Sequence, residues 1–292
     1  MKPTLWMMLA CLALFNACRK SDDPGVLDLH VGYAVNGGPL VCDTLRYVNE
    51  AGNPFLVTEI QWFLSRLELQ NEQGEWIAFG EGDQPYYIDT QLPETQTLRS
   101  QPLPTGHYRA LRFTFGLDEA DNRTGRFPNP PESNMFWPDL LGGGYHYMKL
   151  NGKWQDAEGR RVPLNIHLGI GQNESLTAFY PNHFSVTLPA DLTLSAGQHA
   201  EAQLLMTIDN WFRSPHVYDF GTDGSAIMQN QAAQAKLKEN GADVFSFHPI
   251  EAAPSLSERS LRIMKKAAPQ PHFMTWEHLK ETFNAKNTQE RP

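Results

Sequence analysis

Apolar and polar residues alternate with a period of two in several stretches of the chain. The clearest examples are residues 27–33, 107–117 and 162–169. Because successive side chains of a strand point to opposite faces of a sheet, each stretch predicts a strand that is buried on one face only. The stretch 56–69 changes phase, since Trp62 and Leu69 fall on opposite parities, and a β-bulge at residues 63–65 would explain the change.

Further short apolar stretches recur along residues 26–250, between turns rich in Gly, Pro and Asn. Strands separated by turns in this way are typical of a β-sandwich or a barrel. The sequence therefore predicts an all-β domain over residues 26–250, an antiparallel β-sandwich of the immunoglobulin-like or a related Greek-key type. One short helix is predicted within it, at residues 225–239, with Gly241 as its C-terminal stop.

The N-terminus has the pattern of a secretory signal. Residues 1–17 have a positive start, an apolar run too short to span a bilayer, and the small Ala17 before Cys18. This ending resembles a lipobox, in which Cys18 becomes the acylated first residue. The charges that follow, in a linker over residues 18–25, resemble an acidic export signal or are a solvated run. We expect an extracytoplasmic lipoprotein of the outer membrane, facing the periplasm or the cell surface.

The composition of the chain limits the classes of function that the protein can have. Of three cysteines, only Cys42 lies beyond the lipidation site, so no disulfide is expected in the mature domain. The net charge of -9, without a Lys/Arg cluster, argues against nucleic acid as a partner. Because the common hydrolase, kinase and dinucleotide motifs are missing, we expect a binding protein and not an enzyme. Residues 251–292, which change to Ala, Pro and Lys, are predicted to form a partly helical C-terminal appendage.

An aromatic stretch over residues 128–154 differs from the rest of the chain. Three prolines precede Met135 and Trp137, and a run of three glycines leads into Tyr145, in a predicted strand that ends at an Asn-Gly turn at residues 151–152. Long loops within compact domains are more often functional than incidental. Met135, Trp137 and Tyr145 are therefore candidate binding-loop residues. The alternative is that the Phe-Trp pair of this loop plugs one end of the domain.

Three histidines are candidate metal ligands. Strand parity places His30 opposite Leu29, and His167 opposite Ile166, so both imidazoles should face water or a shared cleft. Neutral imidazole suits copper and zinc, and two such histidines would form an incomplete site with open positions. Two unrelated surface histidines are the alternative. His146 is a weaker third candidate, because an exposed strand histidine explains its position more simply.

A series of short segments resembles, in the same order, the MbnP-like family, which comprises secreted β-rich proteins named for a periplasmic partner of the copper chelator methanobactin. The similarity covers about residues 26–250. The segments that carry it include LDLHV from Leu27, WFLS from Trp62, PTGHY from Pro104, FTFGLD from Phe113, NMFW from Asn134, MKL from Met148, IHLG from Ile166 and IDNWF from Ile208.

The resemblance implies copper binding by histidines and, in a few relatives, by a tryptophan oxidised to kynurenine. By motif position, His30 and His167 carry over as ligands and Trp137 as the aromatic residue of the Met-x-Trp loop. The chain departs from the family pattern in two places: residues 137–141, Trp-Pro-Asp-Leu-Leu, replace the Trp-x-Trp form expected after the methionine, and the tail after Glu251 is extra. We predict that the rings of His30 and His167 converge on one cleft near residues 135–137, where protons compete with copper near pH 6.5.

The resulting interpretation is a lipoprotein that captures or handles copper, with a redox or metal-handling protein as its expected partner. A second interpretation is a non-metal binding module, in which Trp137, Tyr145 and Tyr147 form a flat platform for a glycan or a peptide. A structural accessory lipoprotein is the third. The positions of the histidine and aromatic rings distinguish the first two.

Overall fold

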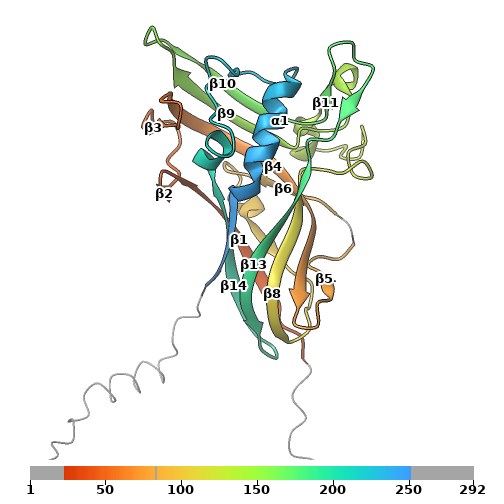
Figure 1. Cartoon of the computed structure of the whole chain (residues 1–292). Coiled ribbons are helices and arrows are strands. Elements are labelled where there is room, and N and C mark those ends of the chain that lie inside the picture. Colours follow the sequence, from red (N-terminus) through yellow and green to blue (C-terminus); the bar gives the residue numbers. More distant parts are fainter. Residues whose placement is uncertain (1–22, 83, 251–292) are drawn as a thin grey trace, which may run out of the picture. The chain divides into compact units, whose positions relative to one another are not determined.

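The structure is a computed structural model that describes residues 23–82 and 84–250. The predicted signal peptide, Cys18 and the predicted C-terminal appendage lie outside the described residues. Within the described part, no helix is long and apolar enough to cross a membrane. The strands of this part form two large sheets and one small hairpin (Figure 1).

The first sheet contains both ends of the described domain. Its strand order is β15-β14-β1-β2, and β7 pairs with β1. Strand β1 runs parallel to β14, whereas the other pairs are antiparallel. The strands are β1 (Val26–Val35), β2 (Gly38–Pro39), β7 (Thr97–Arg99), β14 (His199–Thr207) and β15 (Phe245–Ile250).

The second sheet is built around one long strand, β4 (Pro54–Asn71), in the order β10-β9-β4-β8-β13. Strands β3, β5 and β6 also pair with β4, and β11 pairs with β12 in a separate hairpin. The bounds are β3 (Tyr47–Val48), β5 (Trp76–Ala78), β6 (Tyr86–Asp89), β8 (Gly106–Phe115), β9 (Met148–Gln155), β10 (Arg161–Leu168), β11 (Gly171–Gln172), β12 (Phe179–Tyr180) and β13 (Phe184–Leu194).

The all-β prediction is confirmed, but the sheets are not antiparallel throughout. The prediction was wrong for β1 and β14, whose parallel pairing spans residues 26–34 and 199–207. Parallel neighbours need a long connection, and the whole second sheet lies between these two strands in the sequence. The immunoglobulin-like or Greek-key arrangement remains a prediction.

The bulge expected in β4 is present, slightly beyond the predicted position. The β4–β8 register shifts between Ser65 and Glu68, and Arg66 has a positive φ of 54°. The hydroxyl of Ser65 donates to the Gly116 carbonyl at 2.8 Å, which secures the irregular segment. The shift lets Trp62 and Leu69 both enter the core despite their opposite parities.

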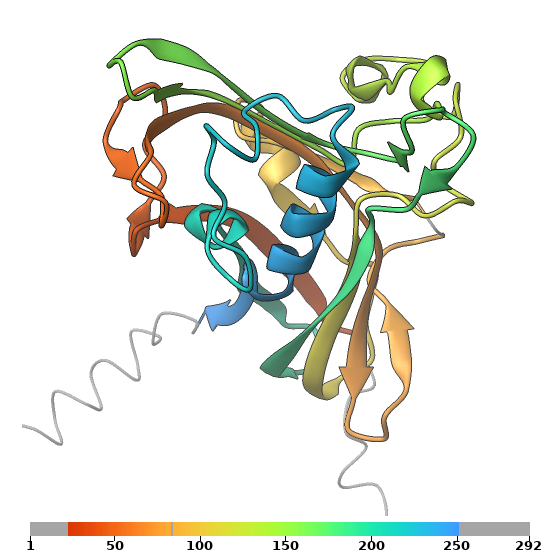
Figure 2. The same ribbon diagram turned by 45° about the horizontal axis from the view of Figure 1, so that its top comes forward.

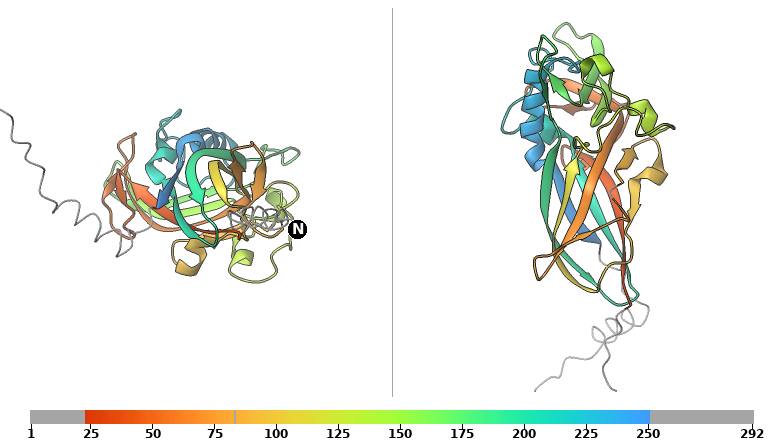
Figure 3. Two further views of the ribbon diagram at one scale, coloured as in Figure 1. Left: turned by 90° about the horizontal axis from the view of Figure 1, so that it is seen from below. Right: turned by 90° about the vertical axis from the view of Figure 1, so that its right-hand side faces the viewer.

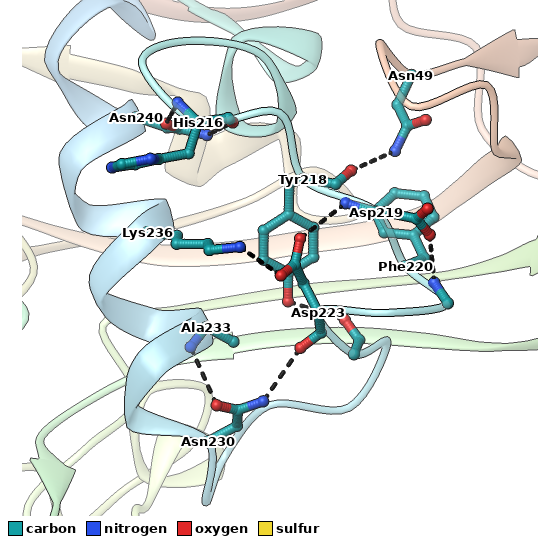
Figure 4. A network of polar contacts seen from close by, with 12 residues as sticks. Asn49, His216, Tyr218, Asp219, Phe220, Asp223, Asn230, Ala233, Lys236 and Asn240 are labelled. Atoms are coloured by element: carbon teal, nitrogen blue, oxygen red, sulfur yellow. Dashed lines mark hydrogen bonds and ion pairs between the residues drawn. The ribbon is translucent and has the colours of Figure 1, made fainter.

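The helix α1 (Gln231–Asn240) begins six residues later than predicted. Asn230 is its N-cap: its side chain accepts from the Ala233 amide at 3.0 Å and donates to the Asp223 carbonyl at 3.1 Å (Figure 4). Residues 225–229 therefore precede the helix: Ala226 bridges to Asn165, and a turn over residues 227–230 leads into the helix. Gly241 stands at the C-cap, as predicted, and continues into the 3-10 turn η5 (Gly241–Asp243).

The helix packs on the core side of the second sheet (Figure 2). Its residues Ala233 and Leu237 belong to the hydrophobic core that both sheets share. The core is rich in aromatic rings, for example Trp62, Phe115 and Trp211, all fully buried. Four further 3-10 turns connect the strands: η1 (Pro93–Gln96), η2 (Glu132–Met135), η3 (Asp139–Leu141) and η4 (Ile208–Phe212).

Candidate metal centre

Residues 128–147 of the aromatic stretch form the second part of the connection between β8 and β9, at the same end of the domain as α1 (Figure 3), and the rest of the stretch lies in β9. Gly142, Gly143 and Gly144 all have positive φ, between 70° and 113°. A side chain on Gly144 would lie 2.2 Å from the Asn122 side chain, so glycine permits this close approach. The run is thus a tightly packed turn and not an open hinge.

This turn folds the candidate loop residues into the protein. Met135 and Trp137 are fully buried, and Tyr145 and Tyr147 are each 2% exposed. The flat aromatic platform of the second interpretation is therefore not present, since its rings have no accessible face. Phe136 is instead the exposed aromatic residue of the loop, at 42%.

Trp137 forms one wall of a small cluster of rings. Its indole nitrogen donates to the Leu141 carbonyl at 3.0 Å. Its ring lies against the backbone of Gly169, where an added Cβ would come within 2.5 Å of an indole carbon. The ring also meets His146 edge to face, with 4.7 Å between centroids.

His146 is the central ring of this cluster, and it is only 5% exposed. The prediction of an exposed strand histidine was wrong, because the loop at residues 132–137 covers its face of the chain. The His146 amide and its ring Nδ1 both contact the Met135 carbonyl, at 2.6 and 2.9 Å. Nδ1 must carry the proton, since a carbonyl only accepts. The buried Nε2 then has a free lone pair and no hydrogen-bond partner among the described residues.

His167 lies beside His146, with 5.1 Å between ring centroids and an interplanar angle of 83°. In β10 it shares the outward face with Asn165, while Leu164, Ile166 and Leu168 are buried, as the parity predicted. Its Nε2 contacts the Asn151 side-chain oxygen at 2.8 Å. Asn151 in turn donates to Glu59 at 3.1 Å, which fixes the amide orientation. Nε2 of His167 is therefore the protonated nitrogen, and Nδ1 has the free lone pair.

Burial keeps both imidazoles neutral. Loss of hydration lowers the pKa of His146 from 6.5 to about 3 and that of His167 to about 4. The nearby positive charge of Lys149 lowers both pKa values further. Lys149 pairs with His167 across the β9–β10 ladder and donates to the Asn134 carbonyl at 2.5 Å. The expected proton competition near pH 6.5 therefore does not apply to this pair.

His30 is not part of the cluster. It lies in β1 of the first sheet, where its Nδ1 contacts the Thr97 hydroxyl at 3.1 Å. Its neighbours Leu29 and Val31 are buried, so the predicted outward orientation is correct. His30 and His167 thus point away from a shared core on two different sheets. The predicted convergence of these two rings was wrong, and His146 lies beside His167 instead.

The pair has the chemistry of metal ligands. In each ring one nitrogen donates to a fixed oxygen, as ligating histidines commonly do, and leaves the other nitrogen free. Two nitrogens that bind one ion, each roughly 2 Å from it, lie within about 4 Å of each other. With 5.1 Å between their centroids, the rings of His146 and His167 lie close to that arrangement. Among residues 23–82 and 84–250, however, no group of three or more His, Cys, Asp or Glu side chains could hold a metal.

The supporting residues Asn151 and Lys149 were missed in the sequence because the hairpin was placed wrongly. The predicted turn at residues 151–152 lies inside β9, where both residues pair with β4 and β10. An added Cβ on Gly152 would lie 2.1 Å from the Leu56 carbonyl oxygen, so this glycine serves a close strand contact and not a turn. The true turn is at residues 156–159, and counting back from it places Asn151 and Lys149 beside His167.

The family model for MbnP matches residues 24–233 of the chain. The chain belongs to the MbnP family. The match covers both histidines of the pair, Trp137 and most of the two sheets. Among solved structures, the MbnP-family chain is similar to MbnP from Methylosinus trichosporium, at a TM-score of 0.51 and 14% identity, over 77% of this chain and 99% of that one. At this identity the likeness concerns the fold alone. No curated protein was found to match the chain.

Proposed function

We propose that this protein is an extracytoplasmic lipoprotein that binds copper through His146 and His167, and that it captures or hands over the metal without turnover. The observation that carries the proposal is the buried, unpaired Nε2 of His146 beside the neutral ring of His167. Leaving such an atom without a partner costs free energy unless a ligand uses it. Membership in the MbnP family supports copper as that ligand.

The surroundings favour a monovalent ion. The ammonium group of Lys149 is close enough to lower both histidine pKa values, and its field also opposes added positive charge on a bound metal. Imidazole nitrogens suit copper in general. Trp137, in contact with His146, shields the site from water on that side. The site therefore fits Cu(I) better than a divalent ion.

Anaerobic titration with Cu(I) and aerobic titration with Cu(II) test the proposal. We expect one Cu(I) per chain, with tighter binding than Cu(II). His146→Ala and His167→Ala should each lower the Cu(I) affinity by at least about tenfold to a hundredfold, because even the loss of residues that support a ligand has effects of that size. His30→Ala is the matched control, since it removes a strand histidine from the other sheet, and its affinity should equal that of the wild type.

Two outcomes would contradict the proposal. One is a wild-type protein that binds neither form of copper. The other is full Cu(I) binding by the His146→Ala/His167→Ala double variant. An effect of His30→Ala equal to that of His167→Ala would place the site elsewhere.

A further inference from the structure

Strand β4 contains a second β-bulge, opposite the part of β9 that lies beside His167. The β4–β9 register shifts between Val57 and Glu59, so that two residues of β4 stand opposite one residue of β9. After the shift Glu59 pairs with Asn151, and Asn151 pairs with Asn165 of β10 on its other side. A β-bulge can re-aim a side chain, and this one aims the Glu59 carboxylate at the side chain of Asn151.

A chain of two hydrogen bonds connects Glu59 to the imidazole of His167. The Asn151 side-chain nitrogen donates to Oε2 of Glu59 at 3.1 Å, and the Asn151 side-chain oxygen accepts from Nε2 of His167 at 2.8 Å. A carboxylate only accepts, so the Asn151 nitrogen must face Glu59 and the Asn151 oxygen must face His167. The direction of both hydrogen bonds is thus set at the Glu59 end of the chain.

This direction decides which nitrogen of His167 is free for a metal. An amide oxygen holds the proton of His167 on Nε2, which leaves the lone pair on Nδ1. If the Asn151 amide turned round, its nitrogen would donate to Nε2, and the proton of the neutral ring would move to Nδ1. The nitrogen that the proposed site uses would then carry a proton, and it could not bind an ion shared with His146.

We propose that Glu59 is a positioning residue of the copper site, which acts through Asn151 to keep Nδ1 of His167 available to the ion. This inference rests on the proposed function, because it concerns the same histidine pair. Partners behind a ligating histidine commonly set its tautomer and its ring orientation. Glu59 also lies near Lys149: burial lowers the pKa of Lys149, and the charge of Glu59 opposes this shift. The test must therefore separate an action through Asn151 from an action through Lys149.

The first readout is the tautomer of His167 in the metal-free full chain, from long-range proton–nitrogen NMR correlations at neutral pH. The wild type should show a proton on Nε2 and a free Nδ1. Glu59→Gln should give a mixture of both tautomers, since glutamine can donate as well as accept and no longer fixes the Asn151 amide. The double variant Glu59→Gln/Asn151→Asp should restore the wild-type tautomer, because a carboxylate at position 151 can only accept from Nε2. An action through Lys149 alone would leave the tautomer unchanged in Glu59→Gln.

The second readout is the affinity for Cu(I) alone, in competition with a chromophoric chelator. Glu59→Gln should lower this affinity by about tenfold, as for loss of a residue that supports a ligand, and the double variant should recover most of it. Glu68→Gln is the matched control, because it removes a glutamate charge from the same strand at its contact with Arg112, and both readouts should match the wild type.

Two results would overturn this inference: a wild-type tautomer in Glu59→Gln, or an affinity that stays low in the double variant although its tautomer is restored. If His167→Ala still loses Cu(I) in either case, the proposed function stands without a role for Glu59. A wild-type protein that binds no copper contradicts the proposed function instead, and the positioning role with it.

Discussion

The buried His146 makes the free energy of unfolding depend on pH even below the range in which an ordinary histidine titrates. Its pKa in the folded protein is about 3, against about 6.5 in the unfolded chain. Between these values the unfolded chain binds a proton that the folded protein does not, so the free energy of unfolding falls as the pH falls. The slope from this residue should be about 1.4 kcal/mol per pH unit.

Denaturant unfolding of His146→Asn at pH 6.0, 5.25 and 4.5 measures this contribution. Asparagine can keep the hydrogen bond to the Met135 carbonyl and cannot take up a proton. The variant should lose less stability than the wild type as the pH is lowered over this interval. A slope in His146→Asn equal to that of the wild type would show that the imidazole of His146 titrates normally.

Gly169 holds the space that the indole of Trp137 occupies. A methyl group there would come within 2.5 Å of the ring, and the fixed position of Trp137 leaves little room to yield. Gly169→Ala should therefore destabilise the protein by about 1–3 kcal/mol, as overpacking in a core usually does. Gly38→Ala is the control, because nothing lies within 4 Å of its added Cβ and its φ is unrestricted. Equal unfolding free energies for the two variants would contradict this packing.

For single residues, the sequence predicted on which face of a strand a side chain lies but not which rings come into contact. Parity correctly predicted the outward faces of His30 and His167, since it depends only on neighbours along one strand. Convergence depends on which sheet each strand joins, and the period of two carries no such information. The burial of His146 was also hidden, because the loop that covers it comes from ten residues earlier in the chain.

Among the elements, the segment before α1 shows how a tertiary contact overrides a local preference. The alanine-rich residues 225–239 predict a longer helix, but Asn165 binds the Ser225 carbonyl and holds the first residues against β10. Asn230 then starts the helix in their place. The bulge in β4 could be predicted because a phase change is visible in the sequence itself. The Asn-Gly pair in β9 could not, because the role of Gly152 depends on β4.

Asn230→Ala tests the role of this cap. Loss of the side-chain bonds to Ala233 and Asp223 should destabilise the protein by about 1 kcal/mol, as loss of an N-cap typically does. The neighbouring exposed Gln229 is not the capping residue, so Gln229→Ala should leave the thermal midpoint nearly unchanged. A thermal midpoint for Asn230→Ala equal to that of Gln229→Ala would show that the helix start is held by other contacts.

For the whole molecule, the two sheets share one core, and this explains why the site lies on one of them. Outward residues of the first sheet, such as His30, are separated from the second sheet by the core itself. The pair of His146 and His167 therefore lies on the side of the second sheet that faces away from this core, where the loop at residues 132–137 covers it.

The anchor proposed for the whole chain is tested by fractionation. Cys18→Ala should move the protein from the membrane fraction to the soluble fraction, because the apolar run before it is too short to span a bilayer. Cys42→Ala is the matched control, and it should stay with the membrane. A Cys18→Ala protein that remains in the membrane fraction would contradict the lipid anchor.

The most direct test of the copper site is anomalous diffraction at the copper edge from crystals of the Cu(I)-loaded protein. We predict a single peak between His146 and His167, roughly 2 Å from Nε2 of His146 and from Nδ1 of His167, as for metal–imidazole bonds in general. A strong peak at His30 or at another surface histidine, with nothing between His146 and His167, would contradict the account.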